Sequence, residues 1–314
     1  MLFFKKRKYY KIIKEAEDLH NEGKLEASRD KYLQAFEDII NIRDYINLAC
    51  IYVDLKEYDK AIQIFLDIIN SDKYKNEEIA DVYFGLAVCY DCQNQKDKAK
   101  ECYENAINFG CKAPECYYFL ACLYDDLELE EDSEESKLAL KYYHKAIEIY
   151  PKYLFAYVNL GNIYARFNKN DKALEYFLKA KELDVDHSAN SDYNLGVIYN
   201  TIGDIDKAEH YYLEELKTEN PYVSTYYNLG ILYKDKKEYD KSLQYYLKSI
   251  EIDKKDFNAW YNLACLYALM NDYDNAFSCL TYIKYNKPKF LETSKSDDEL
   301  IELRKDKRYE ELFK

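Results

Sequence analysis

Residues 154–187, LFAYVNLGNIYARFNKNDKALEYFLKAKELDVDH, contain the pattern that decides the fold of this chain. Tyr157, Leu160, Gly161 and Tyr164 recur at helical spacing, so they lie on one face of a first helix. A polar stretch at 168–171 then interrupts the spacing. A second apolar block follows at Ala173, Phe177 and Ala180. The stretch therefore predicts two helices joined by a short turn, packed through their apolar faces.

The same pattern, roughly 34 residues long, runs almost end to end through the chain. Counting Leu154 as position 1, a small residue at position 8 recurs at Ala16, Ala49, Ala87, Ala121, Gly161, Gly196, Gly230 and Ala264. A length of 314 residues would otherwise suggest two globular domains. Internal repetition predicts one solenoid instead, in which each repeat buries its apolar faces against its neighbours.

The positions of these residues resemble the tetratricopeptide repeat: small at position 8, tyrosine at 11, alanine at 20 and an aromatic residue at 24. The pattern covers about 280 of the 314 residues and is similar to that of bacterial proteins with many such repeats. The resemblance implies an all-α fold, a right-handed α-α superhelix of eight helix-turn-helix repeats closed by a C-terminal capping helix.

The predicted organisation has a basic N-terminal lead over residues 1–8, repeats over 9–290 and a helical cap over 294–314. The eight repeats are expected at 9–41, 42–75, 80–113, 114–153, 154–187, 189–222, 223–256 and 257–290. The fourth repeat carries an acidic insertion at 125–135, DDLELEEDSEE. This insertion lacks the glycine and the ligand order of an EF-hand, so we expect a solvated charge run, with docking of a basic partner as the alternative.

The composition of the chain indicates which partners and which cell compartment to expect. A net charge of -14 repels a phosphate backbone, so we do not expect a nucleic acid as partner. The chain shows neither a secretory signal nor a membrane-spanning stretch, and its nine cysteines fall mostly on helical positions, which favours reduced thiols. We expect a soluble, cytoplasmic protein that does not insert into membranes.

Catalytic and metal sites are not predicted. The four histidines are scattered, and the seven glycines form no phosphate-binding loop. Cys89 and Cys92 make a single CxxC with no second pair and no nearby histidine, a weak signal for zinc. We therefore expect a protein that is not an enzyme and needs no cofactor or metal.

Position 6 of the first helix carries the candidate binding residues. In the tetratricopeptide repeats of O-linked N-acetylglucosamine transferases, which this column resembles, asparagines at this position hold an extended peptide by its backbone. A carboxamide has one acceptor and two donors, which match a peptide unit whatever its side chain. The column contains Asn47, Asn159, Asn194, Asn228 and Asn262, with Lys14, Gly85 and Phe119 in the other repeats. The alternative is that these asparagines contact only water.

Tyrosines at position 5 would supply neighbouring pockets, although many of the 37 tyrosines must be ordinary packing residues. They are Tyr118, Tyr193, Tyr227 and Tyr261. The basic clamp with which related repeats bind acidic chaperone tails is absent, because Ile13, Glu17, Asp81 and Gly85 stand at its positions. We therefore do not expect chaperone C-terminal tails as partners.

Together these features predict a non-catalytic scaffold that binds an extended segment of another protein in its concave groove, mainly at repeats five to eight. The alternative is a regulatory or sensor subunit whose groove holds its own tail or a small ligand. Partner identity, pathway and oligomeric state are not encoded in any motif of the chain.

Overall fold

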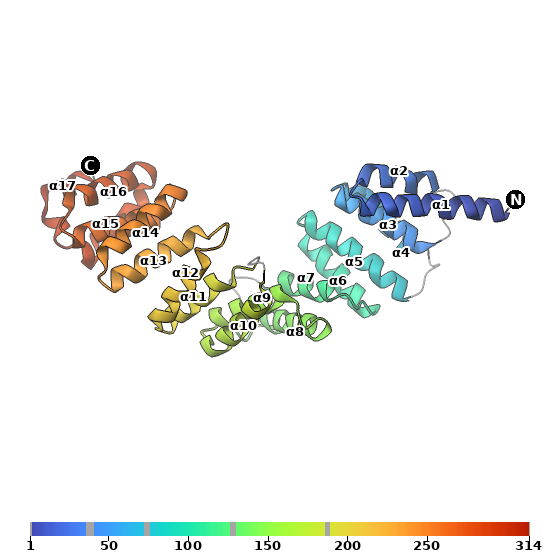
Figure 1. Ribbon diagram of the computed structural model, residues 1–314, viewed down its shortest axis with the longest axis horizontal. Coiled ribbons are helices and arrows are strands. Elements are labelled where there is room, and N and C mark those ends of the chain that lie inside the picture. Colours follow the sequence, from blue (N-terminus) through green and yellow to red (C-terminus); the bar gives the residue numbers. More distant parts are fainter. Residues whose placement is uncertain (1, 36–40, 72–75, 126–129, 186–188, 314) are drawn as a thin grey trace. The chain divides into compact units, whose positions relative to one another are not determined.

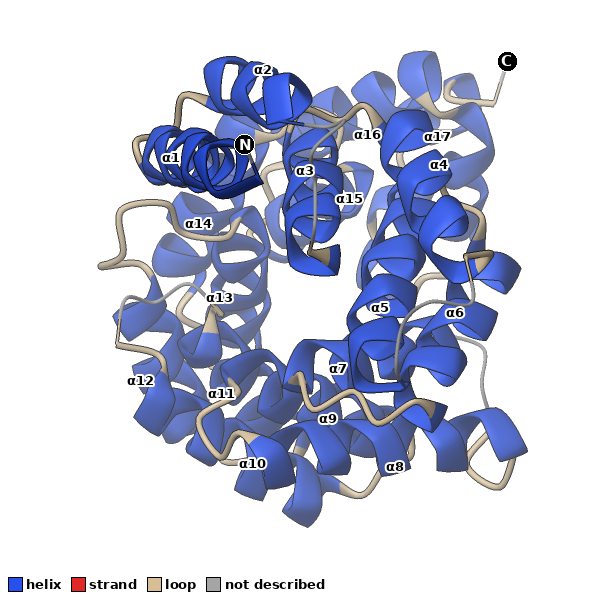
Figure 2. Cartoon of the chain, turned by 90° about the vertical axis from the view of Figure 1, so that its right-hand side faces the viewer, coloured by secondary structure: helices blue, strands red, loops and turns tan. Residues whose placement is uncertain are grey.

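The computed structural model describes residues 2–35, 41–71, 76–125, 130–185 and 189–313, with the side chains of 2–6 and 76–77 excepted. Within these ranges the regular structure consists of α-helices and short 3-10 helices, with no strand (Figure 1, Figure 2). The all-α prediction is confirmed. Part of the predicted acidic insertion, at 126–129, lies outside the described residues.

The chain divides into two compact units, residues 1–163 and 164–314. The helices that begin in the first unit are α1 (Leu2–Asn21), α2 (Leu25–Ala35), α3 (Ile42–Asp54), α4 (Tyr58–Ile69), α5 (Asn76–Cys92), α6 (Lys96–Asn108), α7 (Pro114–Tyr124), α8 (Glu134–Ile149) and α9 (Leu154–Arg166). The unit boundary falls within α9. Helix α1 thus runs through the segment predicted as a separate basic lead.

The second unit continues the alternation of helices and ends in shorter elements. Its long helices are α10 (Asn170–Leu183), α11 (Ser191–Thr201), α12 (Ile205–Glu215), α13 (Val223–Asp235), α14 (Tyr239–Ile252), α15 (Phe257–Leu269) and α16 (Tyr273–Asn286). The C-terminal segment, residues 288–313, contains η2 (Pro288–Lys295), η3 (Asp298–Leu300), η4 (Leu303–Lys305) and α17 (Lys307–Glu311). Within each unit, helices joined by a tight turn pack together as pairs, such as α5 with α6 and α13 with α14.

A left-handed residue closes the first helix of each of seven pairs. Lys237 has φ 59°, and the amide of Glu238 donates to the Tyr233 carbonyl oxygen at 2.9 Å. Together with the bond from the Lys237 amide to the Lys234 carbonyl, this is a Schellman motif. The equivalent left-handed residues are Gly23, Lys56, Asn94, Asn168, Gly203 and Asn271. The same backbone turn thus recurs from repeat to repeat, even where the left-handed residue is not glycine.

The small residues let paired helices approach closely. A methyl group on Gly196 would lie 2.4 Å from Cδ1 of Tyr212, and one on Gly230 would lie 2.5 Å from Cδ1 of Tyr246. Both tyrosines stand at position 24, so the missing side chain of position 8 makes room for their rings. A larger residue at either glycine would cost about 1–3 kcal/mol through overpacking.

Stacked tyrosine pairs recur between the two helices of a repeat. Tyr199 and Tyr211 have centroids 5.4 Å apart with rings 2° from parallel, and Nζ of Lys207 lies 4.9 Å from the Tyr199 centroid. The same arrangement occurs at Tyr233, Tyr245 and Lys241, and at Tyr164, Tyr176 and Lys172. These contacts explain part of the high tyrosine content as intra-repeat packing.

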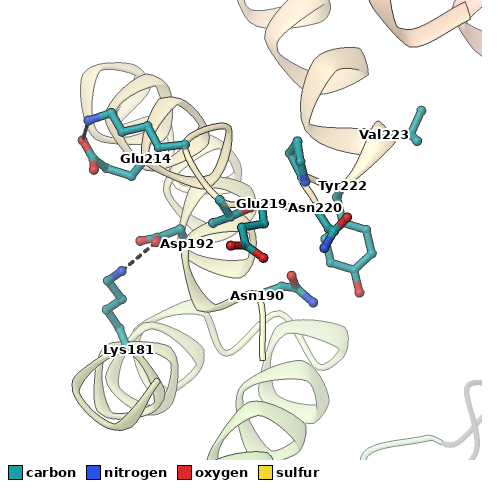
Figure 3. Close-up of a pocket in the computed structure, with 11 residues that line it drawn as sticks. Lys181, Asn190, Asp192, Glu214, Glu219, Asn220, Tyr222 and Val223 are labelled. Atoms are coloured by element: carbon teal, nitrogen blue, oxygen red, sulfur yellow. Dashed lines mark hydrogen bonds and ion pairs between the residues drawn. The ribbon is translucent and has the colours of Figure 1, made fainter. Parts of the chain in front are cut away.

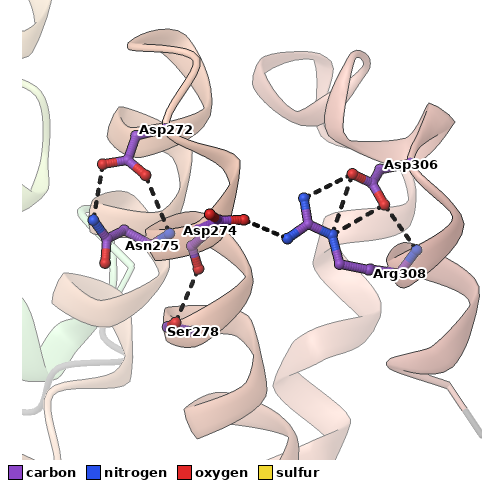
Figure 4. Close-up of polar contacts among 6 residues, drawn as sticks. All are labelled: Asp272, Asp274, Asn275, Ser278, Asp306 and Arg308. Carbon is purple, nitrogen blue, oxygen red and sulfur yellow. Dashed lines mark hydrogen bonds and ion pairs between the residues drawn. The ribbon is translucent and has the colours of Figure 1, made fainter.

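The C-terminal segment caps the last helix pair but is not the single helix that the resemblance implies. Pro288 starts a run of 3-10 turns, and Asp306 accepts from the Arg308 amide at 2.9 Å to start α17 afresh. Arg308 also pairs with Asp274 of α16 at 2.5 Å (Figure 4). The buried apolar side chains of this segment are Leu291, Leu300, Leu303, Tyr309 and Leu312.

The tryptophan of the chain lies in this last region. The ring of Trp260, in α15, stacks on Tyr282 of α16 with centroids 4.3 Å apart and rings 28° from parallel. The indole nitrogen donates to the Lys254 carbonyl oxygen at 3.1 Å. None of the described helices combines the length and the apolar character that crossing a membrane requires.

Candidate peptide-binding surface

The predicted asparagines all lie on the first helices of their pairs. Asn47 is in α3 and Asn159 in α9, within the first unit. Asn194, Asn228 and Asn262 are in α11, α13 and α15, within the second unit. All five side chains are half-buried. Contacts with the rest of the protein therefore help to decide how each carboxamide is oriented.

Several of these carboxamides donate hydrogen bonds to tyrosine hydroxyls of the preceding repeat. Nδ2 of Asn47 donates to the Tyr32 hydroxyl at 3.2 Å, and Nδ2 of Asn262 donates to the Tyr227 hydroxyl at 2.9 Å. Burial raises the pKa of Tyr32 to about 12, so its hydroxyl stays protonated at neutral pH. The hydroxyls hold these carboxamides in one orientation.

Asn159 has the densest set of partners in the column. Its Nδ2 lies 3.0 Å from the Tyr143 hydroxyl, 3.3 Å from the Tyr118 hydroxyl and 3.7 Å from Sγ of Cys122. Tyr143 in turn donates to Asp125 at 3.1 Å. The carboxamide of Asn159 is thus part of a polar network inside the first unit, and Asp125, from the acidic insertion, belongs to that network.

In the second unit the hydrogen-bonded asparagine is Asn262, whereas Asn194 and Asn228 differ from it. Asn194 makes no side-chain hydrogen bond to any residue that the structure describes. Asn228 has no side-chain hydrogen bond to a described residue either; it lies near Tyr212, whose pKa is raised by burial. The equivalent of Tyr212 in the repeat before Asn194 is Phe177, which has no hydroxyl. Sequence reasoning treated the five asparagines as alike and missed this difference.

The position 5 tyrosines differ in exposure. Tyr118, Tyr193 and Tyr227 are half-buried, whereas Tyr261 is only 8% exposed. The Tyr261 hydroxyl donates to Oδ2 of Asp297 at 2.8 Å, and its ring contacts Phe290 edge-on. The C-terminal segment therefore covers Tyr261. Tyr193 instead packs on Tyr222, with centroids 5.2 Å apart.

The contact of the C-terminal segment extends to the preceding repeat. Nζ of Lys234 in α13 pairs with Oε1 of Glu299 at 2.6 Å. Cys265, Asp297 and Glu299 place their ligand atoms within 4.8 Å of one another, close enough to share a metal ion. Lys234 pairs with the Glu299 carboxylate, and the Tyr261 hydroxyl donates to the Asp297 carboxylate. Burial raises the pKa of the Cys265 thiol. We therefore interpret this cluster as an internal polar contact.

A pocket of about 840 Å³ lies within the second unit, where α10 and α12 end and α11 and α13 begin (Figure 3). Its charges are largely paired: Lys181 bonds Asp192 at 2.6 Å, and Lys217 bonds Glu214 at 2.5 Å. The exposed ring of Tyr222 forms part of the wall. Sequence reasoning missed this pocket because its walls come from four helix ends without a shared motif.

The cysteines are all free thiols. Burial raises the pKa of Cys89 to about 12, so within the CxxC this thiol resists the ionisation that metal binding requires. Its neighbour Cys92 is exposed. Neither cysteine belongs to the metal-ligand cluster found among the described residues.

Comparisons with known proteins all indicate the same family. Four family models, each described as tetratricopeptide repeat, match residues 45–74 and 80–109, 153–218, 223–256 and 245–277, together more than half of the chain. The TPR repeat-containing protein MJ1428 of Methanocaldococcus jannaschii is 31% identical over 59% of this chain. Response regulator aspartate phosphatase A of Bacillus subtilis is 26% identical over 64% of this chain.

The chain spans 30% and 54% of the lengths of those two relatives. Among solved structures, pilF of Pseudomonas aeruginosa aligns with a TM-score of 0.58 at 19% identity, over 73% of this chain and 98% of that protein. At this identity the likeness shows the fold alone.

Proposed function

The chain belongs to the tetratricopeptide repeat family, and on that premise we propose that it is a non-catalytic scaffold that binds an extended segment of a partner protein. Asn194, Asn228 and Asn262 of the second unit form the main contact column. Asn47 and Asn159 take the same position in the first unit. Proteins of this family generally mediate protein–protein interaction.

The main support for this proposal is the hydrogen bonding of the position 6 carboxamides. Each bonded asparagine uses Nδ2 to donate inward to a tyrosine hydroxyl, and no described residue donates to its Oδ1. A half-buried acceptor held in one orientation suits the amide of a passing peptide. Each such bond contributes about 0.5–1.5 kcal/mol, while ordering a flexible segment costs about 2–5 kcal/mol. Contacts by Tyr193 and Tyr227 must therefore add to the affinity.

The test uses a peptide selected from a displayed random library with the full chain. Replacing Asn194, Asn228 and Asn262 together by alanine should weaken its binding by at least 10-fold, on the order of three lost bonds. The matched control is Asn108→Ala, an exposed asparagine at the end of a second helix, α6. Equal affinity of the triple variant and the control would rule out the asparagine column.

The melting temperature of the triple variant should fall, because one of the three carboxamides bonds a tyrosine hydroxyl. Alanine at position 262 leaves the Tyr227 hydroxyl without its partner. A buried hydroxyl without a partner costs about 1–3 kcal/mol. Circular dichroism should still show a helical protein, so binding is compared at a temperature where each variant is folded.

A second candidate function is a regulatory subunit whose groove holds its own tail. The specific observation is the bond from Tyr261 to Asp297 together with the pair between Lys234 and Glu299. A relative named regulatory protein RapK, from Bacillus subtilis, is 27% identical over 43% of this chain. Stronger peptide binding after Asp297→Asn and Glu299→Gln would favour this candidate.

We propose a cytoplasmic location, supported by nine free thiols in a chain with ample apolar core. The net charge of -14 supports a protein partner over a nucleic acid. Nothing in the described residues suggests a cofactor, and the absence of the basic clamp argues against acidic chaperone tails.

A further inference from the structure

The pocket of about 840 Å³ in the second unit lies beside a helix that is shorter than its neighbours. Helix α12 ends at Glu215, position 27 of its repeat, whereas α10 and α14 both continue to position 30. Oε1 of the buried Glu215 accepts from the Tyr222 amide at 2.7 Å, and this bond holds the segment 216–222 that follows the helix. Residues 217–222 line the pocket. Its volume lies in the range of about 300–1,000 Å³ that is typical of ligand sites.

The charged side chains of the pocket leave one carboxylate over. Lys181 pairs with Asp192 at 2.6 Å, and Lys217 pairs with Glu214 at 2.5 Å. The exposed side chain of Glu219 forms neither an ion pair nor a hydrogen bond with any residue that the structure describes. The pocket therefore has an acidic character and disfavours an anion as ligand.

The remaining walls carry further acceptors and an aromatic ring. In Figure 3 the Glu219 carboxylate and the carboxamides of Asn190 and Asn220 surround one space, with the Tyr222 ring at its edge. This ring is 46% exposed. Carboxylate and carboxamide oxygens accept hydrogen bonds, and the face of a tyrosine ring attracts a cation. These groups together match a flat cation that has several donors.

We propose that this pocket binds an arginine side chain of the partner protein. A guanidinium has five N–H donors in one plane, so it can bond the Glu219 carboxylate and a carboxamide oxygen while it stacks on the Tyr222 ring. A lysine ammonium would meet the same carboxylate but has no flat face to stack. This inference rests on the function proposed above, because the arginine belongs to the segment that the protein binds.

A direct ring contact connects the pocket to the proposed peptide-binding surface. Tyr193, one of the position 5 tyrosines, packs on Tyr222 with centroids 5.2 Å apart. A segment that contacts Tyr193 therefore reaches Tyr222 with a long side chain. The net charge of -14 also attracts basic segments to this protein. The pocket itself is separate from the asparagine column, because its walls are helix ends and the segment 216–222.

The first measurement needs no partner. N-acetyl-arginine N-methylamide, which carries the side chain on a peptide-like backbone, is titrated into the isotope-labelled full chain. The backbone amide signals of Thr218, Asn220 and Val223 should shift and reach saturation. N-acetyl-citrulline N-methylamide, an uncharged analogue of similar shape, should give no saturable shift. No saturable shift with the arginine probe, or equal shifts with both probes, would overturn the inference.

A third probe distinguishes a partner's side chain from a small molecule. Agmatine carries a guanidinium but lacks the peptide-like backbone. Tighter binding of agmatine than of the arginine probe would assign the pocket to a free cation and would overturn the assignment to a partner protein. Weaker binding of agmatine would support a side chain presented on a peptide.

Two variants test the proposed contacts with the arginine probe. Glu219→Gln should weaken its binding by about 3- to 10-fold, the range for one charge-assisted contact at a partly exposed site. The matched control is Glu26→Gln, which removes the same charge from an exposed position in α2 of the first unit. Tyr222→Leu should weaken binding by about 2- to 5-fold, whereas Tyr222→Phe keeps the ring and should keep the affinity. Equal affinities of Glu219→Gln and Glu26→Gln would contradict the role of Glu219.

The second measurement uses peptides selected from a displayed random library with the full chain. The selected peptides should contain an arginine. Replacing this arginine by citrulline should weaken binding to the unmodified protein by about 3- to 10-fold. The same replacement should change little in Glu219→Gln, because the carboxylate that recognises the charge is absent there.

The outcomes separate this inference from the function on which it rests. A selected peptide that needs the asparagine column but binds equally well with citrulline would keep the proposed function and overturn the inference. Failure to select any peptide would reject the proposed function, while the probe titration would still decide whether the pocket holds a guanidinium.

Discussion

Glu215 occupies a place in α12 where four of the eight repeats have alanine, and it is 1% exposed. Its Oε1 accepts from the Tyr222 amide at 2.7 Å. Burial raises the pKa of the Glu215 carboxyl, with Thr225 and Asp192 beside it. The protonated form therefore fits the folded protein better than the carboxylate does.

This raised pKa predicts a pH-dependent stability with a defined sign. Below the ordinary carboxyl pKa of 4.5 both folded and unfolded chains are protonated here, so Glu215 carries no penalty. As pH rises through the folded pKa, the unfolded chain ionises more readily and the stability that the protonated group provides is lost. Glu215→Gln should therefore raise the melting temperature at pH 7 more than at pH 4.

The neighbouring Glu214→Gln is the control for that experiment. Glu214 pairs with Lys217 on the surface, and this pair lowers its pKa. Its substitution should produce a small change of opposite sign, since surface pairs contribute little. A melting difference for Glu215→Gln that does not vary between pH 4 and pH 7 would contradict the assignment of a buried carboxyl.

At the scale of the element, the left-handed turn residue tolerates side chains that disfavour it. Lys56 and Lys237 adopt φ near 60°, whereas Gly23 and Gly203 take the equivalent place in their repeats. For residues other than glycine and asparagine, this conformation costs roughly 1–2 kcal/mol. The two turns with lysine are therefore less stable than the same turns would be with glycine.

We predict that Lys237→Gly raises the free energy of unfolding by about 1 kcal/mol, the lower part of the cost of a left-handed lysine. Chemical denaturation followed by circular dichroism measures the change. The converse substitution, Gly203→Lys, should destabilise by a similar amount, because nothing lies within 4 Å of the side-chain position and only the backbone is strained. Equal stability of both variants with the unmodified protein would contradict this turn geometry.

Helices and turns were predictable from sequence because their signals are local. Tyr157 and Leu160 mark the first helix of a repeat, and the turn follows at the same distance from the small residue in each. The interactions of the candidate site were not predictable, since Asn262 and Tyr227 lie 35 residues apart and only packed repeats bring them together. The breaks in the C-terminal segment depend likewise on contacts such as that of Arg308 with Asp274.

For the whole molecule, stability follows from contacts between neighbours within each compact unit. The C-terminal segment buries Leu291, Leu300, Leu303 and Leu312 against the last pair of the second unit. At about 1.5–3 kcal/mol for each large apolar side chain, removing this segment would expose a substantial part of that core. In a repeat protein such a loss acts first on the adjacent repeat.

Deleting residues 288–314 should therefore accelerate amide hydrogen exchange in α15 and α16 and promote aggregation, while exchange in α3 to α8 stays unchanged. The full chain carrying Arg308→Ala is the control, because the partner Asp274 side chain is 90% exposed and such a pair contributes little. Accelerated exchange throughout both units would contradict nearest-neighbour stabilisation.

The stacking of Trp260 on Tyr282 gives the protein an intrinsic optical reporter. Since the chain has one tryptophan, emission excited at wavelengths that tyrosine hardly absorbs comes from a single ring at the C-terminal end. Unfolding that starts at this end would shift the emission before far-ultraviolet ellipticity falls, whereas unfolding that starts elsewhere would reverse the order. Fraying of one terminus can thus be timed without attaching a dye.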